Sequence, residues 1–389
     1  MQRSLFGAGT CSFRSSRPSA ISRTCRRHFH DPKPLPPQDE WRAHFPSSFV
    51  DVRDRVSINN LETGRLLADS FLSGKSLGAG ENKVVIEAYP GPGALSRALL
   101  RLPKSKIRKL IILESWDRFY QYLKPLEAVD PRVTVLPIDG YTWDSYSVIE
   151  EKGLLDDVMK HDWNAGIHPE LHFIAQLPHG VYGEQFFSQL FRCMPTKSWL
   201  FKYGRVPMSL VLSQPMWDRG TAPYATNARC KVSVIAEATS QLQNAVRPSE
   251  LQPYDDHFHP STSRVVSKKA ESKRAGQPHV AVNVVPHQDQ LIRSDQLDHW
   301  DYVLRRLFVL KSTPLKNAMN SLAPGAPTLL KVLTDPELPP EERVNINDKI
   351  KNLTIKDWAL IVRAFYNWPF SPEDLTFSNA EDFGPGREG

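Results

Sequence analysis

The stretch KVVIEAYPGPGALSRALL (83–100) decides the fold. Its first half, up to Tyr89, is a β-branched run that predicts a buried strand, and its second half has apolar residues at helical spacing. Gly91 and Gly93 stand where the strand turns into the helix. The backbone can therefore approach a ligand closely at this turn, and the N-terminus of the helix faces that ligand.

The same alternation of apolar runs and helical patterns continues toward the C-terminus. Helical patterns separate the further strands that we predict over residues 109–114, 132–139, 171–176, 198–203 and 208–213. Strands that alternate with helices indicate a parallel sheet covered by helices on both faces. The sequence therefore predicts an α/β fold of the Rossmann-like kind.

Acidic residues end the next two strands. Glu114 ends the second, 23 residues after Gly91, where a carboxylate can accept both hydroxyls of a ribose. Asp139 ends the third strand, where it can accept from an adenine amino group. This order of elements indicates a site for an adenosine-containing ligand. The alternative is that the glycines only make a tight turn and that the acids cap the following helices.

Composition excludes several classes of protein. The chain has 389 residues, of which 40% are hydrophobic and 24% charged, as in a globular protein. It contains no run of about 18 apolar residues, so we expect no membrane-spanning helix. Four cysteines without a CxxC pair argue against a structural zinc site and against a disulfide-stapled fold.

The first 30 residues carry the net charge. They contain six arginines but no lysine or acid. Their charge of +6 equals the formal net charge of the whole chain, so the rest of the chain is neutral overall. An Arg- and Ser-rich leader without acids is typical of a mitochondrial transit peptide. We therefore expect import into the mitochondrial matrix and cleavage near Arg27. The alternative is a basic tail that contacts RNA or DNA.

Composition also predicts the division of the chain. The transit peptide (1–30) precedes a Pro-rich extended spacer (31–49), and the Rossmann-like domain follows over 50–245. Residues 246–295 are polar, rich in Pro and Ser and without periodicity, which predicts a flexible insertion. Helical patterns at 297–310, 314–323 and 354–368 predict a small C-terminal helical domain over 296–389.

At these motifs the chain resembles the dimethyladenosine transferase family, and within it the fungal-type members of the mitochondrial transcription factor B branch. The resemblance covers about residues 50–370 apart from the insertion. The segments that carry it are RVSINNLETGRLLADSF (55–71), EAYPGPGALS (87–96), LESWDRF (113–119), LPIDGYTW (136–143), ARCKVSVIAEA (228–238), FVLKSTPLKNAMNSLAPGA (308–326) and FYNWPF (365–370). Within this pattern, residues 228–238 resemble a late strand, and Tyr89 replaces the usual first glycine.

The resemblance implies a methyltransferase fold that uses S-adenosyl-L-methionine to dimethylate adenines of small-subunit rRNA. It assigns cofactor binding to Asn60, near the methionine end, and to Glu87, Gly91, Gly93, Glu114, Asp139 and Gln176. The sequence leaves open whether the cofactor still binds, because the bulky side chain of Tyr89 stands where its methionine end needs room.

The catalytic tetrad departs from the family pattern. Active members have Asn-Leu-Pro followed by Tyr or Phe, whereas this chain has Gln176-Leu177-Pro178-His179. In the family pattern the amide and a backbone carbonyl accept from the amino group of a flipped adenine, and the aromatic ring stacks on the base. Gln176 moves the acceptor by about an ångström, which can cost a hundredfold in rate. We expect weak or absent methyl transfer. Alternatively, Gln176 only satisfies neighbouring backbone groups.

Nucleic-acid binding by a neutral body requires local clusters of charge. The strongest candidates are Lys268, Lys269, Lys273, Arg274, Arg305 and Arg306, although a solvated face is the more common explanation for any single cluster. Asp255, Asp256, His257 and His259 resemble half of a metal site, but they lie in a polar loop without a second half, so we expect no metal.

Three functions fit these observations. The leading hypothesis is a monomeric mitochondrial transcription initiation factor that assists the mitochondrial RNA polymerase in recognising and melting promoter DNA. The second is an active mitochondrial rRNA adenine N6-dimethyltransferase that acts on small-subunit rRNA. The third is an RNA-binding assembly factor for the small ribosomal subunit. The sequence alone does not separate the three.

Overall fold

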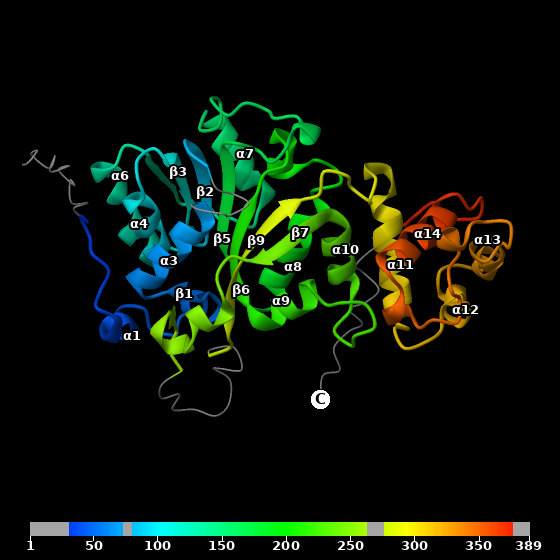
Figure 1. The fold of residues 1–389 in the computed structure, drawn as a ribbon. Helices are drawn as coiled ribbons and strands as arrows, with labels where there is room; N and C mark the ends of the chain where they lie inside the picture. The colour runs from blue at the N-terminus through cyan, green and yellow to red at the C-terminus, as the bar shows by residue number, and fades with distance from the viewer. Residues whose placement is uncertain (1–30, 73–79, 263–275, 376–389) are drawn as a thin grey trace, which may run out of the picture. The chain divides into compact units, whose positions relative to one another are not determined.

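The fold was analysed in a computed structural model, which describes residues 31–72, 80–262 and 276–375. Its centre is a seven-stranded sheet with the order β4-β3-β2-β5-β6-β9-β7 (Figure 1). The strands are β2 (Lys83–Ala88), β3 (Ile107–Leu113), β4 (Val133–Leu136), β5 (Leu171–Gln176), β6 (Met208–Ser213), β7 (Ser240–Asn244) and β9 (His279–Pro286). A separate antiparallel pair joins β1 (Ser57–Ile58) to β8 (Phe258–His259).

The direction of the strands defines the fold class. β2 lies between β3 and β5, and the pairs β2–β3, β3–β4, β2–β5 and β5–β6 are all parallel. Only β9 runs antiparallel to its neighbours β6 and β7. The predicted Rossmann-like methyltransferase fold is thereby confirmed. In such sheets ligands bind beyond the carboxyl ends of the strands where the strand order reverses, which here is between β2 and β5.

Helices cover the sheet. They are α1 (Trp41–His44), α2 (Val50–Asp54), α3 (Leu61–Leu72), α4 (Ala94–Arg101), α5 (Asp117–Leu123), α6 (Leu126–Val129), α7 (Trp143–Glu151), α8 (Gly180–Arg192), α9 (Gln214–Gly220) and α10 (Lys231–Thr239). Val84 and Ile86 of β2 are fully buried in one cluster with Phe186 and Leu190 of α8. On α3, a Cβ at Gly64 would lie 2.9 Å from the carbonyl oxygen of Ala94, so α3 and α4 pack closely.

Four helices form the C-terminal helical region that the sequence predicted. They are α11 (Leu297–Phe308), α12 (Leu315–Ala318), α13 (Leu329–Leu333) and α14 (Ile355–Tyr366). Both α11 and α14 contact α10 (Figure 1). The carboxylate of Asp301 on α11, which is 3% exposed, lies 2.6 Å from Arg192 Nη1 and 3.0 Å from Lys231 Nζ. One buried acid thus joins α8, α10 and α11.

The segment 246–295 is not a flexible insertion throughout, contrary to the prediction from the sequence. Residues 279–286 form β9, whose residues are all buried between β6 and β7. HVAVNVVP is a β-branched run, and the polar residues on both sides of it concealed that signal. Short 3₁₀ helices at Pro248–Leu251 and Tyr254–Asp256 precede it. Residues 263–275 lie outside the described part of the chain.

Three other local predictions were wrong. The spacer is not extended throughout, because a 3₁₀ helix (Gln38–Glu40) and α1 bury Trp41 and Phe45 against α5. Residues 199–203 form a 3₁₀ helix rather than a strand. The segment that resembles a late strand, 228–238, is instead mostly α10, because tertiary packing overrides the strand propensity of its Val and Ile residues.

Candidate functional site

The turn after β2 has the backbone geometry that the glycines predicted. Gly91 and Gly93 have φ angles of +61° and +94°, in the left-handed region that glycine adopts without a steric penalty. Tyr89 also has a positive φ, +56°, which is uncommon for a residue with a Cβ. Tyr89 thus adopts a backbone conformation that glycine adopts without a penalty, and its side chain lines the pocket.

Strand β1 lies directly on this turn. A Cβ built on Gly91 would lie 2.3 Å from the hydroxyl oxygen of Ser57, so only glycine fits there. The space that a bare glycine would leave for a ligand is therefore occupied by the chain's own segment ahead of β2.

Glu114 is the predicted ribose acceptor, and Arg55 binds it. Nη1 and Nη2 of Arg55 donate to Oε1 and Oε2 of Glu114 at 2.8 and 2.5 Å, and both residues are buried. The guanidinium also lies 4.9 Å from the ring centroid of Tyr89 and 5.4 Å from that of Phe119. Burial disfavours the charge on Arg55, but Glu114 outweighs burial and raises the pKa of the guanidinium above its usual value.

Asp139, the predicted adenine acceptor, is bound by two tyrosines. The hydroxyl of Tyr89 donates to Oδ1, and the hydroxyl of Tyr182 donates to Oδ2 at 2.7 Å. Burial, followed by the charge of Asp139, raises the pKa of Tyr89 far above its usual value, and the same two causes together with the hydrogen bond raise that of Tyr182 to about 12. Both phenols therefore stay protonated as donors.

The side chain of Gln176 bridges two backbone segments. Its Oε1 accepts from the backbone N–H of Ile58 at 3.2 Å, and its Nε2 donates to the carbonyl oxygen of Pro90 at 3.1 Å. It is 3% exposed. Of the two interpretations that the sequence allowed, the structure shows the amide satisfying neighbouring backbone groups, which ties β1 to the glycine turn.

Pro178 and His179 line a cavity of about 270 Å³ at the same edge of the sheet, with Arg55, Tyr89, Asp139 and Tyr182. His179 is 5% exposed, and its ring centroid is 5.0 Å from that of His279, with the planes near perpendicular. The His179 ring is therefore almost fully buried and packs against another ring of the chain.

Glu87, the residue before the last of β2, is fully buried. Neither carboxylate oxygen has a well-aligned hydrogen-bond partner among the described residues, although the hydroxyl of Ser96 is close enough to favour the charged form. Burial, helped by the charge of Glu114 and opposed by Ser96 and Arg97, raises the pKa of Glu87 to about 7. Glu87 is therefore largely protonated below neutral pH.

The raised pKa of Glu87 predicts a dependence of stability on pH. Between the unfolded pKa of 4.5 and the folded pKa of about 7, the folded state holds a proton that the unfolded state has lost. This contribution is fully present below the unfolded pKa and is lost as pH rises, by at most about 1.4 kcal/mol per pH unit. We expect Glu87→Gln to remove this pH dependence of the stability.

Urea unfolding at pH 5 and pH 7 measures this effect as the difference between the two proteins. The comparison is needed because burial lowers the pKa of His279 to about 3. This group gives the stability of both proteins a pH dependence of the opposite sign. Equal pH slopes for Glu87→Gln and the unsubstituted chain would show that Glu87 is charged in the folded state.

These contacts test whether S-adenosylmethionine fits. Every oxygen of Glu114 and Asp139 already accepts at least one hydrogen bond from the chain. Asn60 caps α3, because its Oδ1 accepts from the N–H of Glu62 at 2.8 Å and its Nδ2 donates to the carbonyl of Asp256 at 2.9 Å. The acceptors are correctly placed for an adenosine ligand, but in this arrangement the chain's own donors occupy them.

The predicted nucleic-acid residues are separated along the chain. Arg305 is exposed and Arg306 half-buried on α11, with the Arg306 guanidinium 5.5 Å from the ring centroid of Tyr302. Lys268, Lys269, Lys273 and Arg274 lie outside the described residues.

The loop that resembles half of a metal site makes structural contacts. Nε2 of His259 is 2.7 Å from the carbonyl of Phe45, and Nδ1 of His257 is 2.7 Å from the hydroxyl of Thr63. Within residues 31–72, 80–262 and 276–375, no group of three or more His, Cys, Asp or Glu side chains is arranged to hold a metal.

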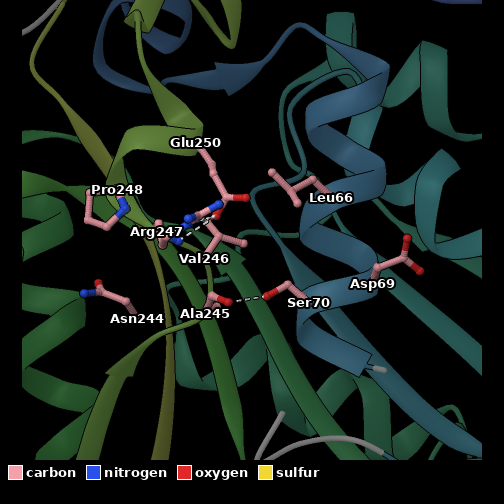
Figure 2. Close-up of a pocket in the computed structure, with 9 residues that line it drawn as sticks. All are labelled: Leu66, Asp69, Ser70, Asn244, Ala245, Val246, Arg247, Pro248 and Glu250. Carbon is pink, nitrogen blue, oxygen red and sulfur yellow. Dashed lines mark hydrogen bonds and ion pairs between the residues drawn. The ribbon is translucent and has the colours of Figure 1, made fainter. Parts of the chain in front are cut away.

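A second cavity, of about 670 Å³, lies between α3 and the segment after β7 (Figure 2). Figure 2 shows the hydroxyl of Ser70 donating to the carbonyl of Ala245, at 2.6 Å, and the pair of Arg247 and Glu250 at its edge. None of the predicted site residues lines this cavity, so it is separate from the pocket at the glycine turn.

Sequence reasoning missed Arg55 and Tyr182. Arg55 is 59 residues from its partner Glu114, and Tyr182 is 43 residues from Asp139. No spacing rule links these pairs, because only folding brings Arg55, which directly follows α2, to the carboxyl end of β3, and Tyr182 of α8 to the loop after β4. The one local signal was Tyr89, a bulky residue at a position where the motif calls for glycine.

The sequence model of the ribosomal RNA adenine dimethylase family matches residues 59–366. The chain therefore belongs to this family. Among the described residues, no helix is long and apolar enough to span a bilayer.

Two kinds of relative align with the chain. The chain is 27% identical over 295 residues to mitochondrial transcription factor 1 of Lachancea kluyveri, covering 74% of this chain and 82% of that protein. For the Saccharomyces cerevisiae protein of the same name, the identity is 27% over 304 residues, with 76% and 83% covered. Identity to dimethyladenosine transferase 1, mitochondrial, of Caenorhabditis elegans is 25% over 199 residues, covering 49% and 53%. Among solved structures, a dimethyladenosine transferase from Plasmodium falciparum matches with a TM-score of 0.47 at 13% identity, covering 78% and 95%.

Proposed function

We propose that this protein is a mitochondrial transcription initiation factor that assists a mitochondrial RNA polymerase at promoter DNA and does not transfer methyl groups. The observation that carries the proposal is the contact set of Gln176. Dimethylation of adenine needs a free acceptor for the amino hydrogens at this position, but both ends of the Gln176 amide are bonded to backbone groups. The buried ring of His179 supports the same conclusion.

The relatives support the biological role. Mitochondrial transcription factor 1 of two yeasts aligns over about three quarters of this chain, whereas the Caenorhabditis elegans transferase aligns over about half. The acid-free leader supports import into mitochondria, where its removal near Arg27 would leave the folded body. Promoter contacts from Arg305, Arg306 and the 268–274 segment are part of this proposal.

Run-off transcription tests the proposal. The assay combines the mature protein with the mitochondrial RNA polymerase of the same organism on a linear promoter template. We expect start-site-specific transcripts only when both proteins are present, and a weaker requirement on a template whose start region is already melted. Unchanged start-site selection without this protein would contradict the proposal.

The alternative is an active rRNA adenine dimethyltransferase. The positive φ angles of Gly91 and Gly93, and the position of Glu114 and Asp139 at the same edge of the sheet, favour it. Loss of adenine dimethylation in small-subunit rRNA when the gene is deleted would support this alternative. Unchanged dimethylation, together with loss of promoter-specific transcripts, would exclude it.

Restoring the family's asparagine is expected not to restore catalysis. In Gln176→Asn the shorter amide cannot reach both Ile58 and Pro90, so we expect a loss of about 1–3 kcal/mol of stability and no methyl transfer. Transfer of labelled methyl groups from S-adenosylmethionine to a small-subunit rRNA fragment measures activity, and urea unfolding measures stability.

The matched control makes the same chemical change at the exposed Gln241 of β7, where we expect no effect on stability. Methyl incorporation by Gln176→Asn above the level of the Gln241→Asn control would show that the remaining pocket is still competent.

A further inference from the structure

The contact between Arg55 and Glu114 has the chemistry of a ligand contact. A carboxylate that binds a ribose accepts from two neighbouring hydroxyls. The guanidinium of Arg55 offers two parallel N–H donors and uses both, at 2.8 and 2.5 Å. Both partners are buried, so the guanidinium shields the carboxylate of Glu114 from water, as a bound ligand would.

We propose that Arg55 is a built-in substitute for the ribose of an adenosine ligand, and that the pocket it fills is a latent nucleoside site. Adenosine is the chemical class that this site would accept once the arginine side chain is removed. The proposal concerns the binding properties of the pocket and does not depend on the role in transcription.

The surroundings of the guanidinium support this assignment. The rings of Tyr89 and Phe119 lie 4.9 and 5.4 Å from it and form aromatic walls for a flat group. Beside it is the cavity of about 270 Å³ that Asp139 and Tyr182 also line. Removing the guanidinium would join its volume to this cavity, next to the carboxylates of Glu114 and Asp139.

The methionine end of the site is closed by different residues. Ser57 fills the space over Gly91, and the backbone N–H of Ile58 binds Gln176. A substitution at Arg55 leaves these contacts in place. We therefore expect the opened site to accept adenosine without gaining affinity from the methionine portion of S-adenosylmethionine.

Thermal unfolding of the full chain tests the proposal. The proteins are the unsubstituted chain, Arg55→Ala and the control Arg53→Ala, whose arginine is 38% exposed and pairs with Asp54 at 3.3 Å. The probes are adenosine, S-adenosylmethionine and methylguanidinium at millimolar concentration. We expect Arg55→Ala to melt several degrees lower than the other two, and adenosine or methylguanidinium to raise its melting temperature by about 1–3 °C.

Neither adenosine nor methylguanidinium is expected to shift the melting temperature of the unsubstituted chain or of Arg53→Ala. S-adenosylmethionine is expected to raise the melting temperature of Arg55→Ala no more than adenosine does. If Arg55→Ala is insoluble, Arg55→Gln, which is shorter and removes the charge and the paired donors of the guanidinium, is measured in the same way and should respond in the same direction. A folded Arg55 variant that does not respond to adenosine overturns the proposal even if methylguanidinium stabilises it, as does an equal response of the unsubstituted chain. Each of these results is independent of the run-off assay.

Discussion

Glu114→Ala is expected to lower the free energy of unfolding by about 3–5 kcal/mol, because it leaves the buried guanidinium of Arg55 without a counter-ion. The backbone N–H of Trp116, which donates to the same carboxylate at 2.9 Å, also loses its acceptor. Urea unfolding followed by circular dichroism measures the loss. The effect is expected to be large because a bidentate ion pair in a buried site cannot be replaced by water.

The control for this prediction is Arg53→Ala. Arg53 and Asp54 form an ion pair whose side chains are 38% and 32% exposed, and such pairs contribute about 0–1 kcal/mol. Replacing both buried partners with leucine should cost less than replacing Glu114 alone, because no uncompensated charge remains. If Glu114→Ala destabilised the protein no more than Arg53→Ala does, the pair would not be the central contact of the pocket.

Trp358→Ala is the second substitution with a large expected effect, about 3–5 kcal/mol. Trp358 on α14 is fully buried and stacks on Phe308 with ring centroids 5.2 Å apart. Removing the indole leaves a cavity in the C-terminal helical region. Because α14 also contacts α10, we expect the helical region to lose protection from amide hydrogen exchange more than β2 and β3 do.

Trp358→Phe is the matched comparison. It keeps an aromatic ring against Phe308 and removes an indole N–H that has no hydrogen-bond partner among the described residues. We therefore expect it to cost much less than the alanine variant. Equal losses for the two variants would contradict the claim that an aromatic ring packed against Phe308 stabilises this region.

The sheet was largely predictable because its strands are buried on both faces. Residues 171–176 and 208–213 are strands with the predicted bounds, since continuous apolar runs are typical of parallel sheets with helices on both sides. Sequence reasoning failed where local and tertiary signals disagree. Residues 231–239 are helical although they contain Val and Ile, and β9 lies among polar residues that favour a loop.

The sequence predicted the hydrogen-bond acceptors of the site but not the side chains that donate to them. The spacing of Gly91, Glu114 and Asp139 follows from the geometry of a strand–helix–strand unit, so their position at one edge of the sheet could be deduced. Arg55, which follows α2, reaches Glu114, and Tyr182 of α8 reaches Asp139; that proximity exists only after folding. That the chain's own side chains occupy the pocket could therefore be found only in the structure.

Calorimetric titration of the unsubstituted protein with S-adenosylmethionine tests the central claim most directly. If Arg55, Tyr89 and Tyr182 hold the carboxylates that would bind adenosine, no saturable heat of binding is expected at micromolar protein and ligand concentrations. Saturable one-to-one binding in the micromolar range would contradict the account, because it would show that the cofactor displaces these side chains.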